Sequence, residues 1–220
     1  MPLETAQLRL ATDAAAQADT AALEQAILSR VRALPGVCHA ALGRNLQGCW
    51  GAGDYTLDVQ YTEAVPGASG LAAALTGLAD VDGATYTPIG GGQRAPQLRD
   101  GIWRTLMFRV RPEAHEQHVL ALEQDTLRMP QYMPGIRNWR LARVNHVNHR
   151  DASGAWTHVW QQEFATIDDL LDEYLMHPFH WGRVDRWFDP EFPEWTVDAI
   201  SHAFCPLHVS LISSQPGTEE

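Results

Sequence analysis

The sequence predicts an α+β protein made of two ferredoxin-like domains, each with the order β-α-β-β-α-β, paired as an α+β barrel. Two observations carry this prediction: the same order of strands and helices occurs twice, and short motifs recur at nearly the same distance. Leu-Pro-Gly-Val at 34–37 returns as Met-Pro-Gly-Ile at 133–136, 99 residues later, and Asp-Tyr-Thr-Leu at 54–57 returns as Ala-Trp-Thr-His at 155–158, 101 residues later. A period of this length indicates a duplicated domain, since solenoid repeats are shorter. Each four-stranded sheet has one face without helices, so the two sheets can close on each other.

The first half of the repeat is expected to form a domain over residues 1–89. We expect strands at 6–14, 37–46, 54–62 and 84–89, and helices from Asp19 or Thr20 to Pro35 and over 69–79. The strand at 54–62 alternates apolar and polar residues, which predicts a half-buried strand. The run from Gly90 to Gly101 has the composition of a linker, so we assign residues 90–101 to one.

The second half repeats the pattern over residues 102–212. We expect strands at 102–110, 136–147, 155–164 and 196–204, and a helix from Pro112 to about Met129. A further helix should begin at Thr166, whose capping-box partner is Asp169, and a short helix or turn should cover 181–188. Residues 213–220 are expected to be a disordered tail.

Bulk properties exclude several classes of function. The chain has 220 residues, 45% of them hydrophobic and 20% charged, and a net charge of −11, which argues against binding to nucleic acid or to an anionic membrane. No apolar run approaches the roughly 20 residues of a membrane span. Three cysteines without metal-site spacing are typical of free thiols, and no secretory signal is visible, so we expect a cytoplasmic protein.

One stretch concentrates polar side chains at the end of a helix. Tyr174, His177 and His180 fall within seven residues, and Pro178 ends or bends the helix that precedes them. The apolar spacing from Ile167 onward predicts that Tyr174 faces inward. The two histidines then lie in a turn beside it, at the rim of an apolar cavity.

These residues resemble a known family. Pro-Gly-Ile at the end of a helix, Thr157-His158-Val159 on a strand, and the run Tyr174-x-x-His177-Pro178-x-His180 are similar to the stress-responsive A/B barrel (Dabb) domains of the dimeric α+β barrel superfamily. The resemblance covers about residues 102–205. The first half looks like a divergent copy with Leu57 at the position of His158, so the resemblance implies one site in the chain.

The resemblance implies roles for three residues. In a plant cyclase of this family that closes a linear polyketide without a cofactor, the catalytic tyrosine and histidine correspond to Tyr174 and His180, and the strand histidine to His158. His180 is the candidate general base because imidazole titrates near neutral pH, and Tyr174 would polarise a substrate carbonyl. His158 alternates with the aromatic residues of its strand, so we expect it on the lumen-facing side. The candidate substrate-binding residues are Trp156, Trp160, Phe179, Trp181 and His177.

Each assignment has a structural alternative. His180 could cap a helix, Tyr174 could pack with its hydroxyl on the backbone, and His158 could be a core histidine. For His177 we favour the structural interpretation, a ring that fixes the His-Pro turn. His115 and His118 have a metal-compatible spacing but lack a third ligand, so we expect no metal site and no cofactor.

Three functions stay open at this point. The first is a cofactor-independent acid–base enzyme, a cyclase, isomerase or lyase, on a small carbonyl-bearing aromatic or polyketide-like compound. The second is a stress-response protein that binds a small molecule without catalysis, and the third is a cofactor-free monooxygenase. In each case the partner is a small molecule, with no nucleic acid and no membrane. The protein is expected to be a monomer through intrachain pairing or a homodimer.

Overall fold

The computed structural model describes residues 2–11, 19–63, 69–148 and 154–212. The predicted tail lies outside the described residues. In chain order the elements are β1 (Leu3–Leu10), α2 (Thr20–Arg32), β2 (Val37–Arg44), β3 (Tyr55–Tyr61), α3 (Leu71–Ala74), β4 (Ala79–Gln93), β5 (Arg99–Val110), α4 (Glu116–Tyr132), β6 (Ile136–Asn148), β7 (His158–Phe164), η1 (Asp169–Tyr174), η2 (His180–Val184), η3 (Asp185–Trp187) and β8 (Val197–Val209).

The eight strands form one antiparallel sheet in the order β2-β3-β1-β4-β6-β7-β5-β8. Each half contributes four neighbouring strands with the same internal order, which confirms two ferredoxin-like units. The halves are joined where β4 pairs with β6. The opposite edges also meet, because Trp50 and His202 exchange backbone hydrogen bonds of 2.8 Å and the amide of Leu46 donates to Phe204 at 3.0 Å. The predicted barrel is therefore built within one chain.

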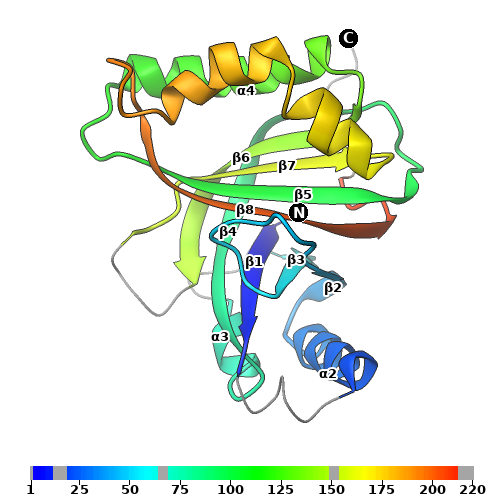
Figure 1. Ribbon diagram of the computed structural model, residues 1–220. Helices are drawn as coiled ribbons and strands as arrows, with labels where there is room; N and C mark the ends of the chain where they lie inside the picture. Colours follow the sequence, from blue (N-terminus) through cyan, green and yellow to red (C-terminus); the bar gives the residue numbers. More distant parts are fainter. Residues whose placement is uncertain (1, 12–18, 64–68, 149–153, 213–220) are drawn as a thin grey trace.

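Helices cover the outer faces of the two half-sheets, at opposite ends of the molecule in Figure 1. Helix α2 buries Leu23, Ile27 and Val31 against the apolar face of β1 and β3. Helix α4 and the segments η1 to η3 pack on β5, β7 and β8, which forms a second and more aromatic core. The layers thus run helix, sheet, sheet, helix.

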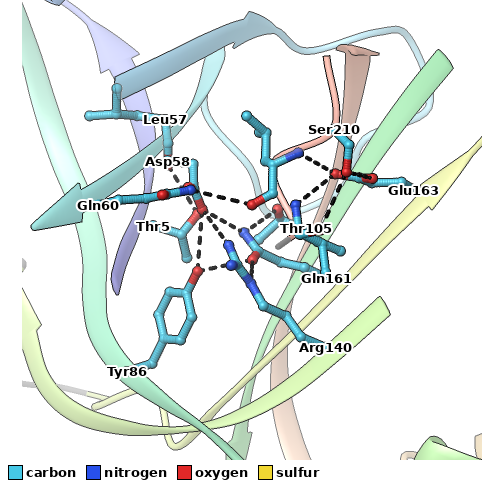
Figure 2. A network of polar contacts seen from close by, with 12 residues as sticks. Thr5, Leu57, Asp58, Gln60, Tyr86, Thr105, Arg140, Gln161, Glu163 and Ser210 are labelled. Atoms are coloured by element: carbon cyan, nitrogen blue, oxygen red, sulfur yellow. Dashed lines mark hydrogen bonds and ion pairs between the residues drawn. The ribbon is translucent and has the colours of Figure 1, made fainter. Parts of the chain in front are cut away.

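The space between the two half-sheets holds a polar network, shown in Figure 2. Asp58 of β3 accepts hydrogen bonds from Arg140 at 2.9 Å, Tyr86 at 3.2 Å and Gln161 at 3.2 Å. The alternation of β3 predicted a half-buried strand, and this prediction is wrong. Its polar face lines the barrel interior and its apolar face lies under α2, so the strand is buried on both faces.

Several predicted elements are wrong in extent. Strand β4 continues through Gly90–Gly92, which pair with Leu141, Arg140 and Trp139, so the first part of the predicted linker is a strand. Glycine fits here because a Cβ at Gly91 would lie 2.6 Å from the Trp139 carbonyl oxygen and one at Gly92 would lie 2.4 Å from the Trp139 ring. Strand β5 begins at Arg99, so the last residues of the predicted linker are also in a strand. The division into domains at residues 89 and 102 stays a prediction.

The helices differ from their predictions as well. The helix predicted over 69–79 is the single turn α3, and α4 begins at Glu116 and not at Pro112. The segment after Thr166 has i→i+5 hydrogen bonding, with the amide of Leu175 donating to the Leu170 carbonyl at 3.1 Å. Within the described residues, no helix has the length and apolar character needed to cross a bilayer.

Candidate active site

A cavity of about 300 Å³ lies between the outer face of the second half-sheet and the helical layer above it. This volume is at the lower end of small-molecule sites, which span about 300–1,000 Å³. Its walls are mainly apolar and come from Leu106, Phe108, Met129, Trp160, Phe188 and Ile200. Its polar side chains are Arg104, Thr126, Tyr174, His180, Asp185 and His202, and Trp50 from the first half also lines it.

Tyr174 reaches the cavity because a capping box starts its segment. The Thr166 amide donates to Asp169 and the Asp169 amide donates to the Thr166 hydroxyl, each at 3.1 Å, as predicted. Tyr174 is 1% exposed, which confirms that it faces inward, and its ring packs edge-to-face on His180 with centroids 4.6 Å apart. Burial raises the pKa of Tyr174, although the positive charge of Arg104 opposes this rise. The hydroxyl is therefore protonated at neutral pH and can donate a hydrogen bond.

His180 begins η2, directly after the His-Pro turn. Its amide donates to the carbonyl of His177 at 2.9 Å, and the amide of Phe179 donates to Nδ1 of His177 at 3.1 Å. His177 therefore holds the turn and does not line the cavity. Nδ1 of His180 lies 3.4 Å from Oδ1 of Asp185, which is close enough for an ion pair but lacks the geometry of a hydrogen bond.

Arg104 of β5 lies against the ring of Tyr174, with 5.0 Å between its guanidinium carbon and the ring centroid. It is 3% exposed, and its Nε donates to Nε2 of His202 at 2.8 Å while Nη1 donates to the side-chain oxygen of Gln162. Burial, together with the charges of Arg104 and His180, lowers the pKa of His202 to about 3. His202 is thus neutral, with Nε2 as acceptor and the proton on Nδ1.

His158 lies on the same sheet face as the cavity but beyond its wall. Its ring stacks on Phe108 with centroids 4.8 Å apart and an angle of 1° between the planes. Nε2 lies 3.0 Å from Glu123 of α4, which also binds Arg143 through two hydrogen bonds. Burial lowers the pKa of His158 even though Glu123 opposes this effect. The predicted lumen-facing orientation is wrong, because this face packs on the helices and the opposite face lines the barrel.

The predicted aromatic residues separate in the structure. Trp160 lines the cavity, whereas Trp156 packs at the barrel interior and donates to Asp82 at 2.6 Å. Phe179 stacks on Tyr132 with centroids 4.4 Å apart, and Trp181 is 59% exposed. Of these four predicted aromatic residues, only Trp160 therefore lines the cavity.

The cavity residues that the sequence analysis did not single out include Trp50, Arg104 and His202. The sequence pattern contained a signal for Arg104 and for His202. Arg104 alternates in phase with Leu106 and Phe108, and His202 with Ile200 and Phe204, so both lie on apolar faces of predicted strands. Trp50 carried no such signal because it reaches the cavity only when the barrel closes.

Comparisons with known proteins agree with the fold. Residues 102–198 match the model of the stress responsive A/B barrel domain. No curated protein matches the chain. Among solved structures, a putative monooxygenase from Fusobacterium nucleatum has a TM-score of 0.57 at 12% identity, covering 94% of this chain and 91% of that one.

Two further solved structures are similar over most of their length. An anthrone oxidase-like protein has a TM-score of 0.57 at 10% identity, covering 99% of this chain and 96% of that one. A chlorite dismutase mutant from Candidatus Nitrospira defluvii has a TM-score of 0.52 at 9% identity, covering 92% and 90%. At these identities the likeness shows the fold alone.

Proposed function

Because residues 102–198 form a stress responsive A/B barrel domain, we propose that its cavity is the active site of a cofactor-independent acid–base enzyme. The proposed substrate is a small carbonyl-bearing aromatic or polyketide-like compound. The observation that supports this most is the edge-to-face contact of Tyr174 and His180 within one mainly apolar cavity. A base and a hydroxyl donor there can act on the same substrate.

The proposed reaction is enolisation followed by carbon–carbon bond formation. His180 removes a proton from the carbon next to a carbonyl group, and the Tyr174 hydroxyl donates a hydrogen bond to the oxygen that gains negative charge. The enolate carbon then attacks a second carbonyl carbon of the same molecule. His180 returns its proton to the new alkoxide, so the net change is an isomerisation that closes a ring.

His158 is assigned a positioning role in this proposal. It contacts the cavity wall through Phe108 and is itself held by Glu123 and Thr157 at 3.0 and 2.9 Å. A change at His158 would therefore act on the shape of the cavity and not on the reacting atoms. His177 would likewise act through the turn that places His180.

A second candidate function is cofactor-free oxygenation. Two structural neighbours are named putative monooxygenase and anthrone oxidase-like protein, and the aromatic wall of Phe108, Trp160 and Phe188 suits a planar substrate. In that reaction a methylene group next to a carbonyl becomes a carbonyl, with one oxygen atom of O₂ retained and the other leaving as water. The same base would form the reactive carbanion.

The test is turnover of a panel of poly-β-ketones and aromatic ketones, with and without O₂, by Tyr174→Phe and His180→Gln. We expect His180→Gln to lower kcat/KM by about 10²–10⁴-fold, with dissociation constants nearly unchanged. Tyr132→Phe and His208→Gln are matched controls, since both residues are exposed outside the cavity. Ligands that bind wild type and both variants equally and are never converted would mean a binding protein without catalysis.

A further inference from the structure

Arg104 is a buried cation without a carboxylate partner in the described part of the chain. Its partners are neutral: His202, the Gln162 side-chain oxygen and the face of Tyr174. The other buried arginine of this sheet, Arg140, forms an ion pair of 2.9 Å with Asp58. Leaving a buried charge unpaired is costly, so proteins pair such charges or use them to bind a ligand.

Two N–H donors beside Arg104 have no hydrogen bond of ordinary geometry among the described residues, although both lie near the Tyr174 hydroxyl. They are Nε1 of Trp160, which is 1% exposed and lines the cavity, and Nε2 of Gln162, which is fully buried. Both approach the Tyr174 hydroxyl closely enough to oppose the rise of its pKa. Buried donors are nearly always satisfied in folded proteins, so two donors that share one hydroxyl without good hydrogen-bond geometry leave room for an acceptor supplied from outside the chain.

The remaining charges around the cavity are consistent with an anion at this position. His202 is neutral because its pKa is lowered to about 3. Asp185 is the one carboxylate among the described lining residues, and it lies beside His180 with 48% of its side chain exposed. Burial lowers the pKa of Arg104 and the charge of Asp185 opposes this effect, but no ion pair joins the two among the described residues and solvent screens the exposed carboxylate.

We propose that Arg104 and Trp160, which line the cavity, form an anion-recognition subsite for the carboxylate of a small aromatic or β-keto carboxylic acid, with Gln162 holding the Arg104 guanidinium from outside the cavity lining. The rest of the ligand lies along the apolar wall, and its carboxylate neutralises the guanidinium in a site that excludes water. This proposal rests on the proposed function in one respect: it names the substrate of that reaction as an acid. Its binding geometry does not depend on catalysis.

The test is calorimetric titration with 1-naphthoate and its neutral analogue 1-naphthamide at pH 7.5. We expect wild type to bind the acid at least tenfold more tightly than the amide. Arg104→Met should weaken binding of the acid at least tenfold and change binding of the amide less than threefold. Arg109→Met, on the same strand but paired with Asp198 near the surface, should behave as wild type.

A second variant keeps the test valid if Arg104→Met does not fold. Trp160→Phe keeps the aromatic wall but removes Nε1, and it should weaken binding of the acid about threefold to tenfold with the amide unaffected. Equal affinity of wild type for acid and amide, no binding of either, or a preference that survives Arg104→Met would overturn the subsite. Preferential binding of the acid without turnover supports the subsite and contradicts the proposed enzymatic function. Turnover of neutral ketones without preferential binding of the acid supports the enzymatic function and contradicts the subsite.

Discussion

The ion pair between Asp58 and Arg140 allows a sharp test of how the two halves are held together. Asp58 belongs to the first half and Arg140 to the second, and both side chains are buried in the barrel interior with 0% and 6% exposure (Figure 2). Asp58→Asn keeps the volume of the side chain and removes its charge. Arg140 then remains buried opposite a neutral amide.

The expected loss follows from the burial of this pair. Breaking a buried ion pair by removing one partner costs about 3–5 kcal/mol, because the other charge is left uncompensated. Glu163 also favours the charged form of Arg140, so we expect a value near 3 kcal/mol. Against a typical total of about 5–15 kcal/mol this is a large share, and it corresponds to a melting temperature lower by roughly 6–12 °C.

The assay is urea unfolding of wild type, Asp58→Asn, Arg140→Met and the double variant. The double variant should lose less free energy of unfolding than the two single variants lose together, because it leaves no unpaired charge. Asp198→Asn is the control, since its pair with Arg109 is partly exposed and should contribute less than about 1 kcal/mol. A loss below about 0.5 kcal/mol for Asp58→Asn, or strictly additive effects, would refute the reasoning.

Three further predictions concern the cavity and the closing edge of the barrel. His202 binds a proton below about pH 6.5 when unfolded but only near pH 3 when folded, so stability should fall with falling pH by about 1.4 kcal/mol per unit between these values. Thermal melts from pH 7 to 4 should show a shallower slope for His202→Gln. Gly43→Ala should cost about 1–3 kcal/mol in urea unfolding, because its Cβ would lie 2.3 Å from Sγ of Cys205, and Cys205→Ala should recover part of the loss. Trp50→Ala should weaken binding of 1-naphthoate about threefold to tenfold by titration and leave the melting temperature nearly unchanged, since Trp50 lines the cavity yet is 64% exposed.

Local patterns predicted most of the elements but not their surroundings. The alternation of β3 indicated a strand with one apolar and one polar face, and the structure has both faces. The pattern could not distinguish solvent from a polar barrel interior, because polar residues such as Thr56 and Asp58 are expected in both environments. The Gly90–Gly92 run was misassigned for a related reason: glycine is typical of linkers, but here it admits the close approach of Trp139.

The candidate site divides in the same way. The positions of Tyr174 and His180 beside each other could be predicted, because a capping box, an apolar spacing and a proline fix the local conformation of one short segment. His158 was placed on the wrong side of the sheet, since alternation predicts two faces of a strand without indicating what covers each face.

The sequence by itself determined the duplication, the order of strands and helices, the family of the second half and the inward position of Tyr174. The order of elements and the position of Tyr174 depend on contacts between residues close in the chain, and the duplication and the family depend on motifs that can be compared without knowing any contact. Only the tertiary structure decided that Trp50, Arg104 and His202 line the cavity with Tyr174, and that the polar face of β3 lies inside the barrel. Those contacts join strands far apart in sequence, and the closure of the barrel brings them together.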